Sequence, residues 1–210
     1  MILRSMPLGP LQANCFIIGC DETRQAAVID PGGDAHRVLS VLEKDALQLA
    51  VILNTHGHVD HVGANMALKK ATGAQLMIHK MDAQMLAHAP QSAAAWGLQA
   101  EASPVPDRLL EDGDTIDCGN LQFKVVHTPG HSQGGCCFYL QNENALFVGD
   151  TLFAGSIGRT DLPGGDYDTL IRSIQTRLFV LPDATKVYNG HMEVTTIGEE
   201  KKFNPFCRMV

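Results

Sequence analysis

A dense group of metal-binding side chains follows a short apolar segment and constrains what this chain can fold into. Residues 55–63 read T-H-G-H-V-D-H-V-G and come just after the apolar run at 49–53. A run of this length predicts a buried strand, and the helix formers at 64–71 predict a helix after the motif. Imidazole and carboxylate ligands suit zinc, iron or manganese, whereas closed structural zinc sites normally use cysteine. The segment therefore predicts a metal site at a strand-to-helix turn.

The ligand-type residues of this motif fall into two sets. His56 and His58 flank Gly57 in an extended loop, so their imidazoles can converge on one ion. Asp60 and His61 face elsewhere, because adjacent side chains at a helix start diverge by roughly a hundred degrees. Two neighbouring ions therefore fit better than one. The alternative interpretation, a solvated polar turn, does not account for this density of ligand-type residues.

Length and composition bound the fold and the compartment. With 210 residues and 45% hydrophobic content, the chain can bury one sizeable core, so we expect a single α/β domain over residues 1–210. The net charge of −7 and the lack of a Lys/Arg run argue against a nucleic-acid-binding surface. Residues 1–10 lack a secretory signal core, and no apolar stretch has the length of a membrane span. Six cysteines without C-x-x-C spacing fit a reducing compartment, and we expect a cytoplasmic protein.

The order of expected elements indicates two sheets. The first half alternates strands with helices, and the second half begins as an antiparallel meander. Expected strands lie at 2–7, 14–19, 25–29, 49–53, 75–79, 115–118, 121–127, 135–140, 145–148 and 186–189. Expected helices lie at 34–45, 64–71, 80–89, 92–100 and 167–178, with Pro90 separating the two short ones. Such an order suggests sheets packed on each other and covered outside by helices.

Further strands of the second half end beside ligand-type side chains, as is common for sites at the carboxyl ends of strands. His131 follows a rigid Pro-Gly turn and is a better ligand than His127, which belongs to the preceding strand. Asp150 follows an apolar strand, where a carboxylate is costly to bury unless a cation or donor meets it, so a bridging role between two ions would suit it. His191 follows another strand in the same way. Structural roles are expected for His36, His79 and His88.

Four motifs carry a resemblance to a known family. The chain resembles the metallo-β-lactamase-fold hydrolases through T-H-G-H-V-D-H at 55–61, T-P-G-H at 128–131, G-D-T at 149–151 and G-H at 190–191. Through G-D-T-L-F and the following G-R-T-D-L-P-G-G-D, it is similar to the short, single-domain relatives of type II glyoxalase, the hydroxyacylglutathione hydrolases. The resemblance implies an α/β fold, the four-layer αββα sandwich, in which two mixed sheets pack face to face with helices outside.

The same resemblance implies a site for two divalent metal ions, with zinc as the first expectation and iron or manganese as alternatives. The implied ligands are His56, His58 and His131 for the first ion, Asp60, His61 and His191 for the second, and Asp150 between them. Many true β-lactamases of this fold carry cysteine near the position of Asp150. Antibiotic hydrolysis is therefore not the expected activity.

The implied reaction is hydrolysis of acyl-thioesters such as S-lactoylglutathione by a hydroxide formed between the two ions. The thiolate leaving group needs little protonation, and Asp60 is the expected catalytic group that orients the hydroxide or takes a proton. Arg159 could contact an anionic substrate, although a salt bridge to Asp161 or Asp166 is an equal alternative. We expect a small-molecule thioester as the partner, no nucleic acid or membrane, and a monomer or small homo-oligomer.

Departures from the family pattern leave other functions open. Type II glyoxalases of full length continue beyond the last histidine with a helical region that supplies basic groups for glutathione, whereas this chain ends 19 residues after His191. Met192 and Glu193 stand where such relatives often have small residues. The alternatives are a mononuclear-iron persulfide dioxygenase, which G-R-T-D also resembles, and a hydrolase of another ester, lactone or phosphodiester. A non-enzymatic metal-binding or partner-binding domain is the remaining alternative.

Overall fold

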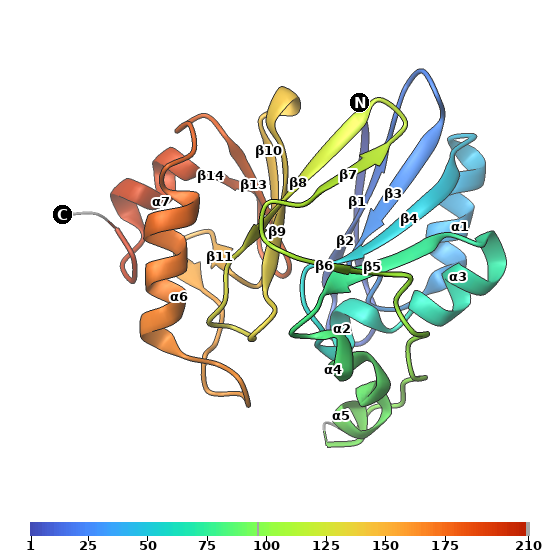
Figure 1. Cartoon of the computed structure of the whole chain (residues 1–210), viewed down its shortest axis with the longest axis horizontal. Coiled ribbons are helices and arrows are strands. Elements are labelled where there is room, and N and C mark those ends of the chain that lie inside the picture. The colour runs from blue at the N-terminus through green and yellow to red at the C-terminus, as the bar shows by residue number, and fades with distance from the viewer. Residues whose placement is uncertain (96, 209–210) are drawn as a thin grey trace.

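The computed structural model describes residues 1–95 and 97–208, and its two mixed sheets lie face to face between outer helices (Figure 1). This arrangement is the four-layer α/β sandwich expected from the sequence. The first sheet has the order β1-β2-β3-β4-β5-β6, with antiparallel pairing from β1 to β3 and parallel pairing from β3 to β6. Its strands are β1 (Ile2–Leu8), β2 (Ala13–Gly19), β3 (Gln25–Ile29), β4 (Gln48–Asn54), β5 (Gln75–His79) and β6 (Arg108–Leu110).

The second sheet has the order β14-β13-β10-β9-β8-β7. Its strands are β7 (Thr115–Cys118), β8 (Leu121–His127), β9 (Cys136–Leu140), β10 (Ala145–Gly149), β13 (Lys186–Asn189) and β14 (Thr195–Thr196). The meander expected for β7 to β10 is present, whereas β13 returns parallel to β10. A separate hairpin, β11 (Leu152–Phe153) and β12 (Ser156–Ile157), follows β10.

Helices cover the outer faces of both sheets. They are α1 (Ala35–Lys44), α2 (Val59–Val62), α3 (Asn65–Thr72), α4 (Ala83–Ala87), α5 (Ala89–Ala95), α6 (Tyr167–Ser173) with its continuation η2 (Ile174–Leu178), and α7 (Ile197–Phe203); a single turn, η1 (Gln141–Glu143), joins β9 to β10. Among the helices of residues 1–95 and 97–208, none combines the length and apolar character needed to cross a membrane.

Three apolar clusters hold these layers together. Between the sheets, Phe16 of the first sheet packs against Phe147 of the second with ring centroids 5.2 Å apart. Val38 and Leu42 lie four residues apart on α1 and pack on the outer face of the first sheet, as helical periodicity requires. Leu170 of α6 packs on the outer face of the second sheet. Burial of each such side chain contributes about 1.5–3 kcal/mol.

The short helices differ from the expected ones. Pro90 was expected to separate two helices, but α5 begins at Ala89 and includes Pro90 in its first turn. Proline is tolerated there because the first N–H groups of a helix have no intrahelical acceptor. The helix expected at 92–100 ends at Ala95 in the structure, so the prediction is wrong for residues 97–100. Residue 96 lies outside the described residues. The strands β6 and β14 and the helix α7 were not expected from the sequence.

The sheet topology brings distant segments to one edge. The parallel pair β3 and β4 places Asp30 beside Thr55, and the parallel pair β10 and β13 places Asp150 beside Gly190. Gly190 also accepts a hydrogen bond from the backbone N–H of Asn14, with N and O 2.6 Å apart, at the start of β2. The carboxyl ends of four strands from both sheets therefore meet at the same end of the sandwich.

The imidazoles of His79 and His127 stack where β5 and β8 end, with ring centroids 4.1 Å apart and planes at 11°. His127 Nε2 donates to the carbonyl of Gln133, with N and O 2.9 Å apart. Burial, with repulsion from His127 and Lys80, lowers the pKa of His79 to about 4, against the opposing charges of Glu111 and Asp112. The stack therefore joins the end of β5 in the first sheet to the end of β8 in the second, and the lowered pKa of His79 favours its neutral ring.

We expect this stack to make stability depend on pH. Because the pKa of an unfolded histidine is about 6.5, the unfolded chain binds a proton between pH 6.5 and 4 that the folded chain does not. The contribution of His79 is complete above pH 6.5 and falls as the pH drops toward 4. Urea unfolding of His79→Gln should show a smaller loss of stability between pH 7 and 5 than the wild-type chain. Parallel pH dependences in the two proteins would contradict this role.

Candidate metal centre

Three histidines form a first group at the end of the sandwich. The ligand atoms of His56, His58 and His131 lie within 4.8 Å of one another. His56 and His58 come from the loop after β4 and His131 from the loop after β8, and the ring nitrogens His58 Nδ1 and His131 Nε2 are 2.9 Å apart. The ring nitrogens of this set are therefore close enough together to bind one ion. We call this set the first histidine group.

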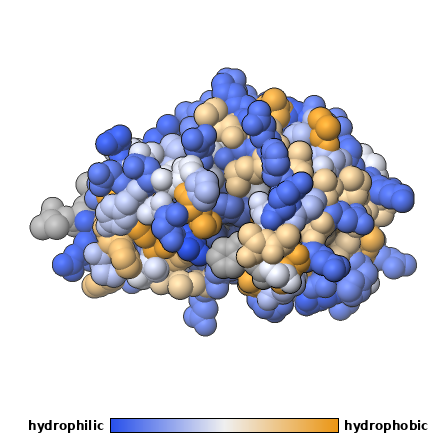
Figure 2. Space-filling model, turned by 90° about the horizontal axis from the view of Figure 1, so that it is seen from below, coloured by the Kyte–Doolittle hydropathy of each residue, from blue (hydrophilic) through white to orange (hydrophobic). Residues whose placement is uncertain are grey.

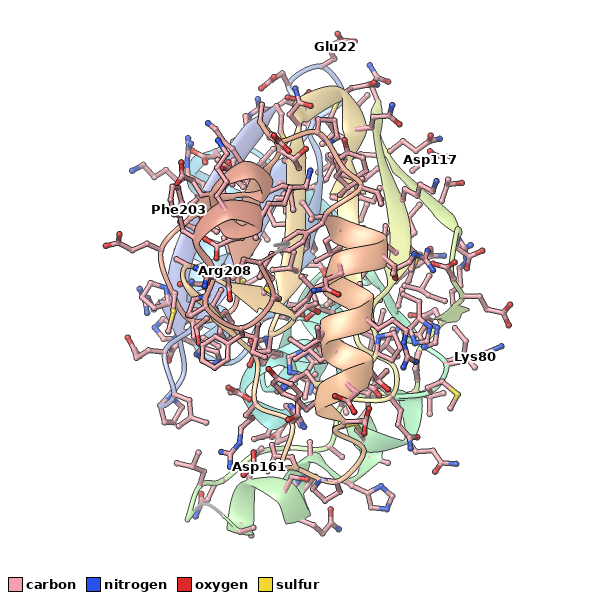
Figure 3. The ribbon with its side chains drawn as sticks, turned by 90° about the vertical axis from the view of Figure 1, so that its left-hand side faces the viewer. Glu22, Lys80, Asp117, Asp161, Phe203 and Arg208 are labelled. Atoms are coloured by element: carbon pink, nitrogen blue, oxygen red, sulfur yellow. The ribbon has the colours of Figure 1, made fainter. Side chains whose placement is uncertain are left out.

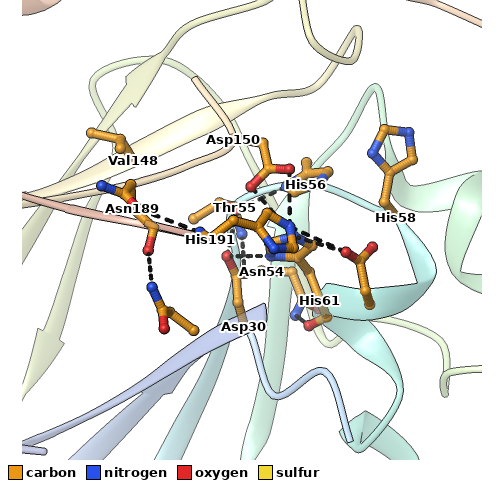
Figure 4. A network of polar contacts seen from close by, with 12 residues as sticks. Asp30, Asn54, Thr55, His56, His58, His61, Val148, Asp150, Asn189 and His191 are labelled. Carbon is orange, nitrogen blue, oxygen red and sulfur yellow. Dashed lines mark hydrogen bonds and ion pairs between the residues drawn. The ribbon is translucent and has the colours of Figure 1, made fainter. Parts of the chain in front are cut away.

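A second group adjoins the first. The ligand atoms of Asp60, His61 and His191 also lie within 4.8 Å of one another. Although Asp60 and His61 are adjacent at the start of α2, His191 meets them both, with His191 Nε2 3.3 Å from Asp60 Oδ2. The rings of His56 and His61 are 4.1 Å apart, so the two groups share a border. Figure 4 shows this convergence of side chains from both sheets. We call this set the second group.

Asp150 lies between the two groups. Its Oδ2 is 3.7 Å from His131 Nε2 of the first histidine group and 3.4 Å from His191 Nε2 of the second. Its Oδ1 is 3.4 Å from His61 Nε2. The seven residues predicted as ligands therefore lie together. His127 lies outside both groups, in its stack with His79.

Hydrogen bonds orient three of the imidazoles with Nε2 toward the centre. The Thr55 hydroxyl donates its one hydrogen to Asp30 (2.6 Å between oxygens), so it can only accept from His56 Nδ1 (3.0 Å). His61 Nδ1 donates to Asp30 Oδ2, 3.1 Å away. His131 Nδ1 likewise donates to a backbone carbonyl, 2.7 Å away. Bonds of this kind fix the ring and the tautomer of metal-binding histidines.

The first histidine group favours neutral imidazoles. Burial and the neighbouring histidines lower the pKa of His56 well below its ordinary value. Burial, with repulsion from His131 and His61, lowers the pKa of His58 to about 4. A neutral imidazole offers the lone pair that a metal ion requires.

The second group attracts positive charge. Burial alone would lower the pKa of His61, but the carboxylates of Asp150, Asp60 and Asp30 outweigh it and raise this pKa to about 9. Hydrogen bonds to Asp150 and Asp60 raise the pKa of His191 to about 10. Both shifts show a strongly negative local field, in which a cation is stabilised.

Buried polar atoms that lack a partner show that the residues present fit metal ions. Within the described residues, His56 Nε2, His61 Nε2 and Asp150 Oδ1 are buried and have no hydrogen-bond partner. A buried polar atom without a hydrogen bond is costly. Here three of them converge on one small region, and two of them, His61 Nε2 and Asp150 Oδ1, are 3.4 Å apart. Divalent cations would satisfy all three.

A cavity of about 490 Å³ opens above the two groups. His58, Asp60, His131, Asp150 and His191 form its floor. Its walls combine apolar and polar side chains from both halves of the chain: Leu11, Val59, Ser92, Phe153, Ser156, Ile157, Arg159, Leu162 and Met192. Figure 2 shows this end of the molecule, where apolar and hydrophilic side chains are interspersed. The volume suits a small-molecule ligand.

Comparison with known proteins agrees with this geometry. The family model of the metallo-beta-lactamase superfamily matches residues 8–191, which include all seven clustered residues. The chain belongs to the metallo-beta-lactamase superfamily. It is 41% identical over 208 residues to the hydroxyacylglutathione hydrolase GloC of Haemophilus influenzae, with 98% of each chain covered.

Two solved structures are also similar along nearly the whole chain. The BLEG-1 B3 metallo-beta-lactamase has a TM-score of 0.92 at 38% identity, covering 98% of this chain and 99% of its own. TTHA1623, solved in a di-iron-bound form, has a TM-score of 0.89 at 39% identity, covering 98% of this chain and all of its own. These similarities support a metal-binding hydrolase fold.

Sequence reasoning missed two buried carboxylates beside the clustered histidines. Asp30 is 1% exposed and accepts from both the backbone N–H and the hydroxyl of Thr55 as well as from His61. An acidic residue directly after the buried strand β3 is the signal that could have found Asp30, but the Asp-Pro-Gly-Gly pattern is equally typical of a turn. The other carboxylate, Asp82, contacts the loops of the first histidine group.

Proposed function

We propose that the chain is a dinuclear-metal hydrolase that cleaves acyl-thioesters of the hydroxyacylglutathione type. The position of Asp150 carries this proposal, because one carboxylate lies between two complete ligand groups at the floor of a substrate-sized cavity. The similarity to GloC supports the choice of thioester. We propose glutathione as the thiol part of the substrate.

The residues of the proposed site have separate tasks. The first histidine group would hold one ion, and the second group would hold the other. Asp150 would contribute a ligand to both ions. When bound, the two ions, zinc first and iron or manganese otherwise, would lower the pKa of a water molecule and polarise the thioester carbonyl. Asp60 Oδ2 is the carboxylate oxygen nearest to His191 and can orient that water or accept its proton. The thiolate would leave without a dedicated acid, because the pKa of a free thiol is only about 8.5, far below that of an alcohol.

The cavity walls would position the substrate. Phe153 and Ile157 of the β11–β12 hairpin and Leu162 in the following loop present apolar surface beside the floor. Such surface excludes bulk water and packs against the carbon chain of an acyl group. Leu11 and Met192 also line the cavity and are 44% and 46% exposed, so they remain available for contact with the thiol part of a substrate.

Arg159 provides positive charge at this cavity, but it is held by a partner. Its Nε and Nη2 donate to Asp161, each bond 2.7 Å long, in the loop before α6 (Figure 3). Asp166, the other expected partner, instead caps α6 by accepting from the N–H of Thr169. The carbonyl of Arg159 accepts from His131 Nδ1, so its backbone belongs to the site.

We expect Arg159→Ala to raise KM for an anionic thioester about two- to fivefold, the effect of one exposed ion pair worth up to about 1 kcal/mol. Its kcat should change less than twofold, because the guanidinium would bind the substrate and its transition state equally. Steady-state kinetics on S-lactoylglutathione measure both constants. Arg177→Ala is the matched control, since Arg177 pairs with Asp112 away from the cavity. An equal KM in the wild-type chain and Arg159→Ala would exclude substrate binding by this side chain.

Thiol release tests the proposed function itself. The metal-loaded chain should free glutathione from S-lactoylglutathione, with kcat/KM of at least about 10⁴ M⁻¹ s⁻¹, the lower end for enzymes on their own substrates. A panel of other thioesters, lactones and phosphodiesters run beside it ranks the substrate classes. Oxygen uptake on glutathione persulfide by a chain with one iron, or no turnover on any substrate, would contradict the proposal.

A further inference from the structure

Asp82 is a buried carboxylate that joins three segments of the chain. It stands directly before α4, where an aspartate ordinarily caps the helix, and its side chain is 1% exposed. Its oxygens instead accept from donors outside α4. Oδ2 accepts from the N–H of Gly57 (3.1 Å) and the hydroxyl of Ser132 (2.7 Å), and Oδ1 accepts from the N–H of Gly134 (2.6 Å). Burying a carboxylate is costly, and these three donors offset that cost.

The three donors belong to the loops that carry the first histidine group. Gly57 separates His56 from His58, and Ser132 directly follows His131. These loops come from different sheets, since the first follows β4 and the second follows β8. The hydrogen bonds to Asp82 thus connect the two loops whose histidines must meet at one ion.

The packing around Asp82 leaves no room for a side chain at Gly57 or Gly134. A Cβ at Gly134 would lie 2.6 Å from the backbone nitrogen of Asp82, and a Cβ at Gly57 would lie 2.6 Å from Met85 Cβ of α4. Both distances are shorter than real contacts. The glycines therefore let the two loops press against the start of α4, where the carboxylate holds them.

We propose that Asp82 is a positioning residue that sets the spacing of the first histidine group and thereby its affinity for metal. The inference rests on the proposed metal centre and assigns a role within it. The second group has other partners than Asp82. Its hydrogen bonds and ion pairs are chiefly with Asp30 and Asp150. The effect of Asp82 is consequently specific to one group.

The test compares metal affinities in two single-group backgrounds. His191→Ala weakens the second group and leaves the first intact, whereas His131→Ala does the reverse. Asp82→Asn keeps the size of the side chain but replaces one oxygen by a donor, so at least one backbone N–H loses its acceptor. Zinc is titrated in competition with a chromophoric chelator, and cobalt absorption spectra report the geometry of each group.

The expected result is a 10- to 100-fold weaker zinc affinity for Asp82→Asn in the His191→Ala background, the usual size of such effects, with an altered cobalt spectrum. In the His131→Ala background, the affinity should stay within twofold. Equal affinities with and without Asp82→Asn in both backgrounds, or equal losses in both, would overturn the proposal. If the wild-type chain binds zinc but cleaves no thioester, the proposed function fails while this test still decides on Asp82.

Glu200 supplies a matched control. It is also a buried carboxylate, and it accepts from the N–H of Gly155, the hydroxyl of Thr195 and the amide of Asn204. Glu200→Gln should lower the midpoint of urea unfolding without weakening zinc binding by the first histidine group. A loss of zinc affinity equal to that of Asp82→Asn would assign the effect to general destabilisation and overturn the proposal.

A milder variant keeps the test open should Asp82→Asn fail to fold. Ser132→Ala removes one of the three hydrogen bonds to Asp82 and leaves the backbone donors in place. It should weaken zinc binding in the His191→Ala background by less than Asp82→Asn, in the range of two- to tenfold. An unchanged zinc affinity in this variant would contradict the positioning role of Asp82.

Discussion

Asp150→Asn is expected to lower kcat/KM for thioester hydrolysis by at least about a thousandfold, which corresponds to roughly 4 kcal/mol of transition-state stabilisation. Asparagine has nearly the same size as aspartate but carries no charge and only one acceptor oxygen. Asp150 faces His131 on one side and His61 and His191 on the other, so both groups lose their common carboxylate. Thiol release measures the rate, and elemental analysis measures the metal bound per chain.

Asp183→Asn is the matched control for this prediction, because Asp183 is a surface carboxylate paired with Lys201 and lies outside the cavity. Its activity and metal content should equal those of the wild-type chain. Two metals per chain and a rate within tenfold of wild type in Asp150→Asn would show that this carboxylate does not connect the groups.

Removal of the metals should lower the temperature of unfolding by roughly 10 °C. At free metal a thousandfold above Kd, binding stabilises the folded chain by about 4 kcal/mol. For a chain of this size, each kcal/mol shifts the unfolding temperature by about 2–4 °C. The chelated protein should remain folded, because the three apolar clusters consist of other side chains and include none of the candidate ligands. Calorimetry of chelated and reloaded protein measures the shift.

The Asp150→Asn variant serves as the comparison for this second prediction. Since it should hold less metal, chelation should shift its unfolding temperature by less. Identical unfolding temperatures for chelated and reloaded wild-type protein would mean that the folded chain does not bind metal more tightly than the unfolded chain.

Local patterns predicted the part of the site that is contiguous in sequence. The strand before the motif, the ligand-type residues and the following helix lie next to one another, so periodicity and spacing were sufficient to place His56 and His61. The same logic, a ligand-type residue at the end of a buried strand, found Asp150. It applied equally to Asp30, whose left-handed backbone (φ 52°) and following Pro-Gly-Gly also fit a simple turn.

Asp82 could not have been found in this way. By local pattern it is a helix cap, and its donors lie 25, 50 and 52 residues away along the chain. Only the packing of two sheets brings them together. Local pattern also fails for Pro90. Proline breaks a helix in its interior but is tolerated in the first turn, where Pro90 lies in α5.

The proposed function depends on two metal ions that would share Asp150 at the floor of one cavity. Anomalous diffraction at the metal absorption edges, recorded from crystals of the metal-loaded chain, tests it most directly and identifies the metals as well. We expect two peaks, one among the nitrogens of the first histidine group and one among the ligand atoms of the second, both beside the Asp150 carboxylate. A single peak, or a pair of peaks away from Asp150, would contradict it.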